Sequence, residues 1–222
     1  SLAPAFLEGL GAIDLMDTGT FTLDSGEGVL GYVLDASGLA LVGSQVGLRA
    51  GELPSSLGTA ADLDGRFTLR ARPGDYAMEV IPPAGSGLPE VVVAAPGEIA
   101  IQPGHLSTLT FRYGAVAVQE IDLRVVASAA PVADARVTLE ATAIAGAGVL
   151  EAVDDVTGTQ TFEATGLVRV TALTDASGRL PLLRLPAAIY RVVVEPFGTV
   201  PAGYGTTVIP AASASSGGRS AV

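Results

Sequence analysis

The stretch most suggestive of chemistry in this sequence is a pair of carboxylates ahead of a glycine, Asp62-Leu63-Asp64-Gly65. Closely spaced carboxylates are typical of calcium loops, but calcium takes about six to eight oxygen ligands, and a loop that closes after Gly65 supplies too few. The alternative is a tight turn between two strands, in which glycine accepts a positive φ angle and Asp62 caps the turn. We predict the turn and keep Asp62 and Asp64 only as weak candidates for metal ligands.

The other residues that could do chemistry are one histidine and one acidic pair. Because His105 is the sole histidine, a metal site based on imidazole would have one such ligand, and a Ser-His-Asp triad could only be built around it. His105 lies in a turn with no nucleophile-elbow pattern nearby, so we expect a solvent-facing loop histidine. For Asp154-Asp155 we favour a solvated acidic turn over a binding loop. We expect no catalytic residue and no cofactor.

The composition indicates a folded chain and argues against several classes of partner. Of 222 residues, 49% are hydrophobic and 16% are charged. No apolar run approaches the ~18 residues that cross a bilayer, so we expect no membrane insertion. The net charge is −11, with 12 basic residues that are all arginine, and such a surface repels phosphate backbones and anionic lipid. We therefore expect no nucleic-acid partner. Cysteine is absent, which excludes disulfides.

Alternation of apolar and polar residues dominates the chain and predicts half-buried antiparallel strands. In residues 75–81, Tyr76, Met78 and Val80 share one face. Most glycines and prolines fall between such stretches, where turns are expected. The sequence therefore predicts an all-β chain. The same alternation occurs at residues 108–113, 135–141 and 189–195.

The two halves of the chain carry the same order of residues, which predicts an internal duplication. Residues 59–83 recur as residues 171–197, and residues 28–50 parallel residues 120–141. Both tyrosines of the repeat lie on inward faces and are expected in the core. The matched pairs are Asp62 with Asp175, Gly65 with Gly178, Pro73 with Pro186 and Tyr76 with Tyr190.

The repeats predict the organisation of the chain. Residues 27–114 form a first sandwich, and residues 115–210 form a second one. An insertion at about residues 143–166 of the second copy is expected as a loop or an extra hairpin on the rim of that sandwich. Residues 1–26 are predicted to be partly strand and to pack on a sheet edge, and residues 211–222 are a tail rich in Ser, Gly and Ala.

In order and spacing, these residues resemble the carboxypeptidase regulatory-like domain, which belongs with the transthyretin-like and Cna B-type (prealbumin-like) sandwiches. The second copy departs from the family pattern, with Leu180 in place of phenylalanine and Ala187-Ala188 in place of Pro-Gly. The matching residues are Gly28, Val33, Val46, Leu48, Asp62, Gly65, Phe67, Pro73, Gly74, Tyr76 and Pro82 in the first copy, and Val137, Leu139, Thr174, Asp175, Gly178, Pro186, Tyr190 and Pro196 in the second.

The resemblance implies two tandem sandwiches, each of about seven strands in Greek-key order. It does not imply an enzyme, because the peptidase of that family name is a separate zinc domain and no H-x-x-E motif occurs here. Hydroxyisourate hydrolases and intradiol dioxygenases of related folds need more than one histidine. The Lys–Asn isopeptide bond of Cna B-type domains cannot form, since the chain contains neither residue.

We therefore expect a non-catalytic structural module of a secreted or cell-surface bacterial protein, with a role in spacing, adhesion or homomeric assembly, including fibrous assembly. The mean hydropathy of +0.49 is high for a soluble monomer, and lysine, a usual guard of sheet edges, is absent. Copies of the chain are the expected partners, through sheet edges or termini. GC-rich coding explains the hydropathy equally well. The alternative function is an accessory carbohydrate- or peptide-binding domain of a larger secreted hydrolase.

Overall fold

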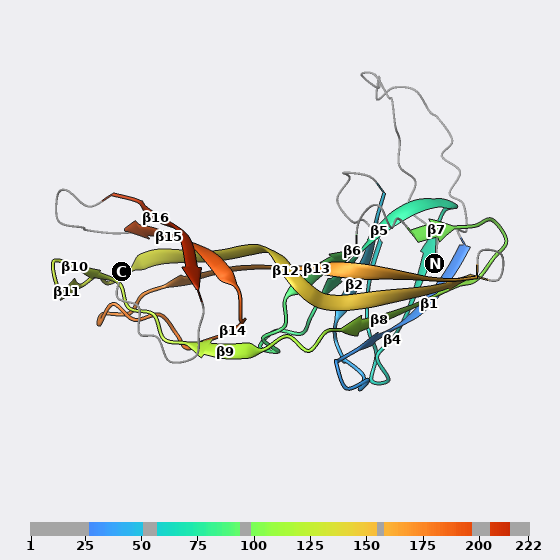
Figure 1. Ribbon diagram of the computed structural model, residues 1–222, viewed down its shortest axis with the longest axis horizontal. Coiled ribbons are helices and arrows are strands. Elements are labelled where there is room, and N and C mark those ends of the chain that lie inside the picture. Colours follow the sequence, from blue (N-terminus) through green and yellow to red (C-terminus); the bar gives the residue numbers. More distant parts are fainter. Residues whose placement is uncertain (1–26, 51–56, 94–98, 155–157, 197–204, 214–222) are drawn as a thin grey trace, which may run out of the picture. The chain divides into compact units, whose positions relative to one another are not determined.

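The computed structural model describes residues 27–50, 57–93, 99–154, 158–196 and 205–213. Every regular element in these ranges is a strand, which confirms the predicted all-β class (Figure 1). These ranges contain no helix with the length and apolarity needed to cross a bilayer. The strands are β1 (Glu27–Leu34), β2 (Gln45–Arg49), β3 (Leu57–Ala60), β4 (Arg66–Ala71), β5 (Gly74–Ile81), β6 (Glu90–Val93), β7 (Ile99–Ile101), β8 (Ser107–Tyr113), β9 (Val118–Ile121), β10 (Val126–Ala127), β11 (Ala130–Pro131), β12 (Ala135–Asp154), β13 (Gly158–Leu173), β14 (Leu183–Pro186), β15 (Ile189–Pro196) and β16 (Thr207–Ser213).

The chain folds into two compact units, each built from separate stretches of sequence. Unit 1 comprises the described residues up to Val80, together with Val93–Arg112 and Val149–Phe162. Unit 2 comprises Ile81–Val92, Tyr113–Gly148 and the described residues from Glu163 onward. The predicted N-terminal segment, 1–26, lies outside the described residues, as does the predicted tail beyond Ser213.

In unit 1, β1 lies between β4 and β8. β1 pairs with β4 in the antiparallel direction and with β8 in the parallel direction, from Val29 opposite Ser107 to Leu34 opposite Arg112. The parallel pairing differs from the antiparallel one that we predicted for residues 108–113. Alternation in a sequence indicates which side chains face the core, but it does not fix the direction of the neighbouring strand. Two further antiparallel pairs are β2 with β3 and β5 with β7.

The buried side chains follow the predicted faces of the strands. In β5, Met78 and Val80 are fully buried, and in β8 so are Leu109 and Phe111. Polar neighbours such as Asp75 remain exposed. The alternation in sequence therefore identified the core-facing positions of both strands.

In unit 2, the first part of β12 pairs with β15, and β15 pairs with β16. β16 ends at Ser213, so it includes the first three residues of the predicted tail. β14 pairs with β9, and β10 pairs with β11. The apolar core of this unit consists of Val125, Ala135, Val137, Leu139, Ala141, Ile144, Val168, Leu180, Leu185, Tyr190, Val192 and Val194.

The predicted insertion at residues 143–166 forms parts of the two longest strands, β12 and β13. Its middle portion, Val149–Phe162, belongs to unit 1. The sequence repeats had placed these residues in the second sandwich, residues 115–210. Leu150 is fully buried in this portion. β12 also pairs with β13 and β8, so this segment belongs to paired strands, and of the two predicted alternatives the loop is wrong.

Candidate functional site

The carboxylate of Asp62 is occupied by the turn that it closes. Its Oδ1 accepts hydrogen bonds from the backbone N–H groups of Asp64 and Arg66, each at 2.9 Å. The N–H of Gly65 donates to the carbonyl of Asp62 at 3.0 Å. Gly65 has a φ of 72°, a conformation that favours glycine. The side chain of Asp62 therefore serves the backbone, and the exposed Asp64 contributes its N–H group to the same turn.

Asp175 makes the equivalent turn in unit 2. Its Oδ1 accepts the N–H groups of Ser177 and Arg179 at 2.8 and 2.9 Å, and the hydroxyl of Ser177 at 2.7 Å. The hydrogen bond from the Ser177 hydroxyl, followed by that from the backbone of Arg179, holds the pKa of Asp175 below its ordinary value of 3.8. Gly178 completes the turn with a φ of 75°.

A third turn of this kind was missed by the sequence analysis. Asp35 accepts the hydroxyl of Ser37 at 2.7 Å and the N–H of Leu39 at 2.9 Å, and these bonds lower its pKa as well. The signal was present in the sequence, because Asp-Ala-Ser-Gly occurs both at 35–38 and at 175–178. The three aspartates therefore act as acceptors for their own turns.

We expect Asp175→Ala to lower the thermal unfolding midpoint near neutral pH, because three donors lose their acceptor. The folded-state pKa lies below the unfolded value of 3.8, so the carboxylate contributes stability above that value and loses it as the pH falls through the folded pKa. The gap between wild type and Asp175→Ala should therefore close in strong acid. Circular dichroism melts from pH 7 down to about 2 measure it.

The matched control is Asp64→Ala, which removes an acid from the Asp62 turn but keeps its N–H group as a donor to Asp62. Its effect should be smaller than that of Asp175→Ala. A gap between wild type and Asp175→Ala that stays constant at every pH would contradict the assigned role of the carboxylate.

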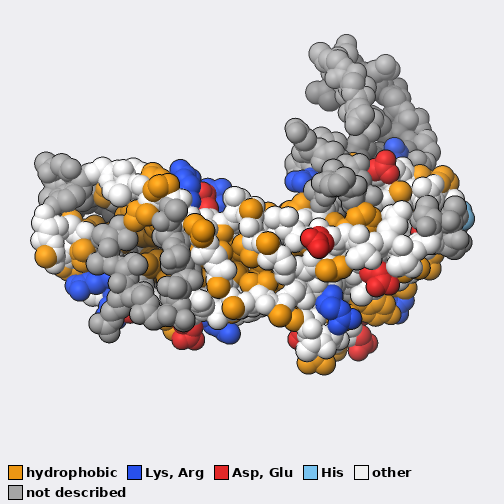
Figure 2. Space-filling view, in the orientation of Figure 1, with side chains coloured by type: hydrophobic (Ala, Val, Ile, Leu, Met, Phe, Trp, Pro, Cys, Tyr) orange, Lys and Arg blue, Asp and Glu red, His pale blue; other side chains and the backbone are white. Residues whose placement is uncertain are grey.

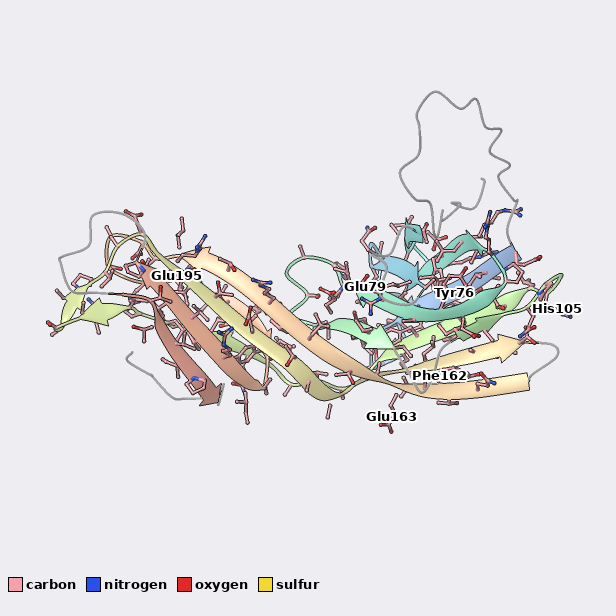
Figure 3. All side chains as sticks on the ribbon, turned by 90° about the horizontal axis from the view of Figure 1, so that it is seen from above. Tyr76, Glu79, His105, Phe162, Glu163 and Glu195 are labelled. Atoms are coloured by element: carbon pink, nitrogen blue, oxygen red, sulfur yellow. The ribbon has the colours of Figure 1, made fainter. Side chains whose placement is uncertain are left out.

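Tyr76 and Tyr190 are buried at matching positions, with 6% and 2% of each residue exposed. The hydroxyl of Tyr76 donates to the carbonyl of Arg72 at 3.0 Å, and that of Tyr190 donates to the carbonyl of Pro186 at 2.7 Å. Burial raises the pKa of Tyr190 to about 12 and also raises the pKa of Tyr76. Each hydroxyl ties its strand to the segment just before it, and Figure 3 labels Tyr76 within its unit.

The remaining markers of the repeat divide into buried and exposed positions. Phe67 is 2% exposed, and Pro186 is also buried. Pro73 and Gly74 are exposed where β5 begins. The two prolines that the alignment pairs therefore lie in different environments.

The other candidates for chemistry do not come together. His105 is half-buried in the turn before β8, and not fully solvent-facing as expected (Figure 3). Asp154 is 7% exposed at the end of β12, so the expectation of a solvated turn is wrong there, because β12 continues as a paired strand through this position. Asp155 lies outside the described residues. Within the described ranges, no three His, Cys, Asp or Glu side chains lie close enough to hold a metal.

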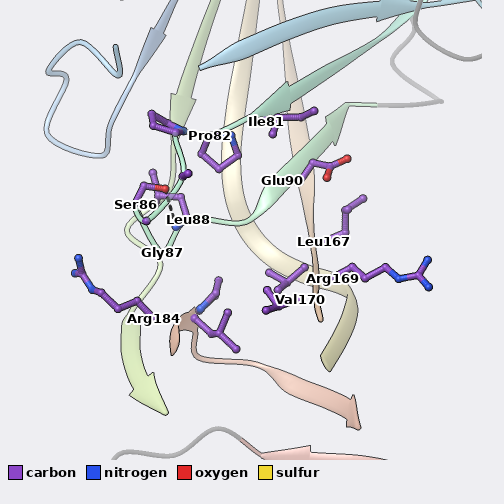
Figure 4. A pocket seen from close by; sticks show the side chains of 16 residues that line it. Ile81, Pro82, Ser86, Gly87, Leu88, Glu90, Leu167, Arg169, Val170 and Arg184 are labelled. Carbon is purple, nitrogen blue, oxygen red and sulfur yellow. Dashed lines mark hydrogen bonds between the residues drawn. The ribbon is translucent and has the colours of Figure 1, made fainter. Parts of the chain in front are cut away.

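A groove of about 320 Å³ in unit 2 was not predicted from the sequence (Figure 4). It is lined by the segment 81–88 and Glu90, by Leu167–Val170 of β13 and by Arg184–Pro186 of β14. Most of these residues are apolar, whereas Arg169 and Arg184 extend from it on opposite sides in Figure 4.

Comparison with known proteins gives distant similarities only. No family model matches the sequence, and no curated protein matches it. Among solved structures, a Streptococcal ancillary pilin is 13% identical with a TM-score of 0.41 over 91% of this chain. The minor pilin GBS52 of Streptococcus agalactiae is 15% identical with a TM-score of 0.41, over 89% of this chain and 94% of that pilin.

The Bacillus anthracis TIE protein is 17% identical with a TM-score of 0.35 over 90% of this chain. The chain spans 64% of the length of the ancillary pilin and 33% of the TIE protein. The carboxypeptidase regulatory-like assignment therefore remains a prediction, and the all-β architecture follows from the strands of this chain.

Proposed function

We propose that this chain is a non-catalytic structural module of a secreted or cell-surface bacterial protein, with a role in spacing, adhesion or homomeric assembly. The observation that carries the proposal is that the polar side chains singled out as candidates for chemistry make hydrogen bonds to the backbone. The carboxylates of Asp62 and Asp175 accept backbone N–H groups, and the hydroxyls of Tyr76 and Tyr190 donate to backbone carbonyls. These side chains stabilise a scaffold.

We also propose that the chain arose as two tandem copies of one sandwich, and matching hydrogen bonds support this. The N–H of Val33 donates to the carbonyl of Gly65 at 2.8 Å, and the N–H of Val125 donates to that of Gly178, also at 2.8 Å. Two further bonds match at 2.8 and 3.0 Å, from Ala61 to Ser44 in the first copy and from Thr174 to Ala135 in the second. The turns closed by Asp62 and Asp175 are therefore hydrogen-bonded to corresponding segments of their own copies.

Exposed apolar side chains support a role in assembly. Leu39 and Leu63 are 68% and 84% exposed in the Asp35 and Asp62 turns, and Figure 2 shows apolar side chains between scattered charges. Among the described strands, β16 pairs only with β15, so it forms a sheet edge. Sheet edges and clustered apolar surface are the features through which β-proteins associate. In unit 2, the exposed large apolar residues include Leu173, Leu182, Ile189 and Val208.

Static light scattering of the full chain over roughly a hundredfold range of concentration tests the proposal, since mass action makes assembly depend on concentration. We expect the mean mass to rise above that of one chain, 22.2 kDa. Electron microscopy of the concentrated sample would separate closed oligomers from fibres. A mass of one chain at every concentration would contradict homomeric assembly.

The second candidate function is an accessory binding domain, and the groove in unit 2 is the observation that favours it. Its lining contains no aromatic residue. Sugar-binding surfaces commonly stack aromatic rings on the ligand, so the groove suits a peptide better than a carbohydrate. Titration of the chain with short peptides and with oligosaccharides, followed by calorimetry, distinguishes the two ligands.

A further inference from the structure

β13 presents an open edge in unit 2. On the side of β13 that faces away from β12, β6 pairs only with Thr165–Leu167, in the antiparallel direction. β13 continues to Leu173, and no other strand in the described part of the chain pairs with that side. Backbone groups of Val168–Leu173 are therefore available on that side to an added strand.

The groove described above lies beside this edge, because Leu167–Val170 form one of its walls. Ten of its sixteen lining residues are apolar, among them Pro82, Leu88 and Val170. Side chains alternate along an extended strand, so a strand added to β13 would direct every second side chain toward this apolar wall. The volume of about 320 Å³ is at the small end for ligand pockets and suits one or two large side chains.

The charges around the groove favour an acidic occupant. Arg184 is exposed on β14, and the side chain of Arg169 is 75% exposed on β13. The carboxylate of Glu140 lies 3.3 Å from Arg169 and 2.8 Å from Arg191, so one carboxylate serves two guanidinium groups. Glu90 is the single acid in the lining. Arg184 lies opposite Glu120 of β9 in the strand pairing, and both Arg184 and Arg169 are exposed to a partner. The chain has a net charge of −11, so another copy of it can supply carboxylates to these arginines.

One stretch of the chain outside the described residues has the required pattern. In Asp17-Thr-Gly-Thr-Phe-Thr-Leu-Asp-Ser25, Phe21 and Leu23 alternate with threonines, and an aspartate stands at either side. The 26 residues ahead of β1 have a reach of at most about 85 Å when extended, which is enough to meet a neighbouring molecule. The apolar pair suits the groove wall, and the aspartates suit the arginines.

We propose that the groove at the β13 edge binds residues 17–25 of a second copy of this chain as an added strand beside Val168–Leu173. The inference rests on the proposed homomeric assembly and names its contact. Phe21 and Leu23 fill the groove, and the aspartates meet Arg169 and Arg184. Each copy offers both a groove and a donor segment, so the contact is head-to-tail and can extend into a chain of molecules.

The test compares the self-association of full-length variants by sedimentation. Arg184→Glu changes the groove, and Asp17→Arg with Asp24→Arg changes the donor segment. We expect each to weaken association by about tenfold or more, and the two changes combined in one chain to recover most of the loss. The control is Arg66→Glu, an exposed arginine of β4 in unit 1, which should associate like wild type.

Hydrogen exchange gives a second readout that does not depend on charge reversal. Amides of Val168–Leu173 should exchange more slowly as the wild-type concentration rises, whereas in Arg184→Glu they should not. Unchanged exchange in the rest of unit 2 shows that the variant is folded.

Each other outcome overturns the inference in a distinct way. Association that is insensitive to both sets of variants would place the contact elsewhere and leave the proposed function intact. Equal weakening by Arg66→Glu would show unspecific charge attraction. Protection of Val168–Leu173 at every concentration in a monomer would show that the chain's own segment fills the groove. A monomer without such protection would contradict both the groove contact and homomeric assembly.

Discussion

Leu150→Ala is expected to lower the free energy of unfolding by about 2–5 kcal/mol, the usual cost of truncating a large buried aliphatic side chain. Leu150 is fully buried in the part of β12 that belongs to unit 1. Had residues 143–166 been a loop on a rim, this change would cost little. Urea denaturation followed by circular dichroism measures the difference.

Val149→Ala is the matched control for Leu150→Ala. Val149 is the preceding residue of the same strand and is 42% exposed, so its truncation should cost less than about 1 kcal/mol. Similar losses for both variants would contradict the placement of β12 in the core of unit 1. A selective loss for Leu150→Ala would show that a segment distant in sequence completes this unit.

The alternation of residue types predicted the strands that keep one phase along their length. β15 buries every second residue from Tyr190 to Val194, β5 buries Tyr76, Met78 and Val80 with Ala77 buried as well, and the sequence placed Tyr76 and Tyr190 on the inward faces. The turns were also predictable, because an Asp followed by Gly at a fixed offset leaves few backbone alternatives. The turn at Asp35 was missed because the two halves of the chain were matched as whole copies, in which Asp-Ala-Ser-Gly at 35–38 does not correspond to the same motif at 175–178.

The sequence left a loop or an extra hairpin open at residues 143–166, and it did not predict that this segment continues the two longest strands, because the pattern of β12 changes phase. In β12 the buried positions include Val137, Leu139 and Ala141, then Ile144, and later Leu150 and Asp154. The odd-numbered series ends at Ala141 and an even-numbered one begins at Gly148, and between them Ile144 and Ala147 are buried in a stretch of alanines and glycines that includes Gly146 with a φ of 66°. An irregularity of this kind redirects a strand without ending it. Alanine and glycine differ little in hydrophobicity, so an alternation of apolar and polar residues cannot indicate a strand there.

The groove was unpredictable for a different reason. Its walls come from the segment 81–90, from β13 and from β14, which lie far apart in sequence. No periodicity links them, and only tertiary packing brings Gly87 against Val118, where an added Cβ would lie 2.5 Å from a methyl group. Contacts of this kind depend on the whole fold, whereas turns and strand faces depend on a few neighbours.

Gly178→Ala is expected to destabilise the chain by about 2–5 kcal/mol, because a positive φ and a steric collision act together. Gly178 has a φ of 75°, and a Cβ there would lie 2.5 Å from the carbonyl oxygen of Val125. Gly158 is the matched control, since its φ is 76° but no atom of the described residues lies within 4 Å of its added Cβ. Gly158→Ala should therefore cost only the backbone strain, about 1 kcal/mol.

The same pair of measurements bears on the proposed duplication. In unit 1, a Cβ at Gly65 would lie 2.6 Å from the carbonyl oxygen of Val33, as a Cβ at Gly178 in unit 2 would lie 2.5 Å from that of Val125. Gly65→Ala should therefore resemble Gly178→Ala and exceed Gly158→Ala when all three are unfolded in urea. If Gly178→Ala cost no more than Gly158→Ala, the close approach of the Asp175 turn to Val125 would be wrong. If Gly65→Ala and Gly178→Ala differed widely, the two turns would not be equivalent parts of one repeated design.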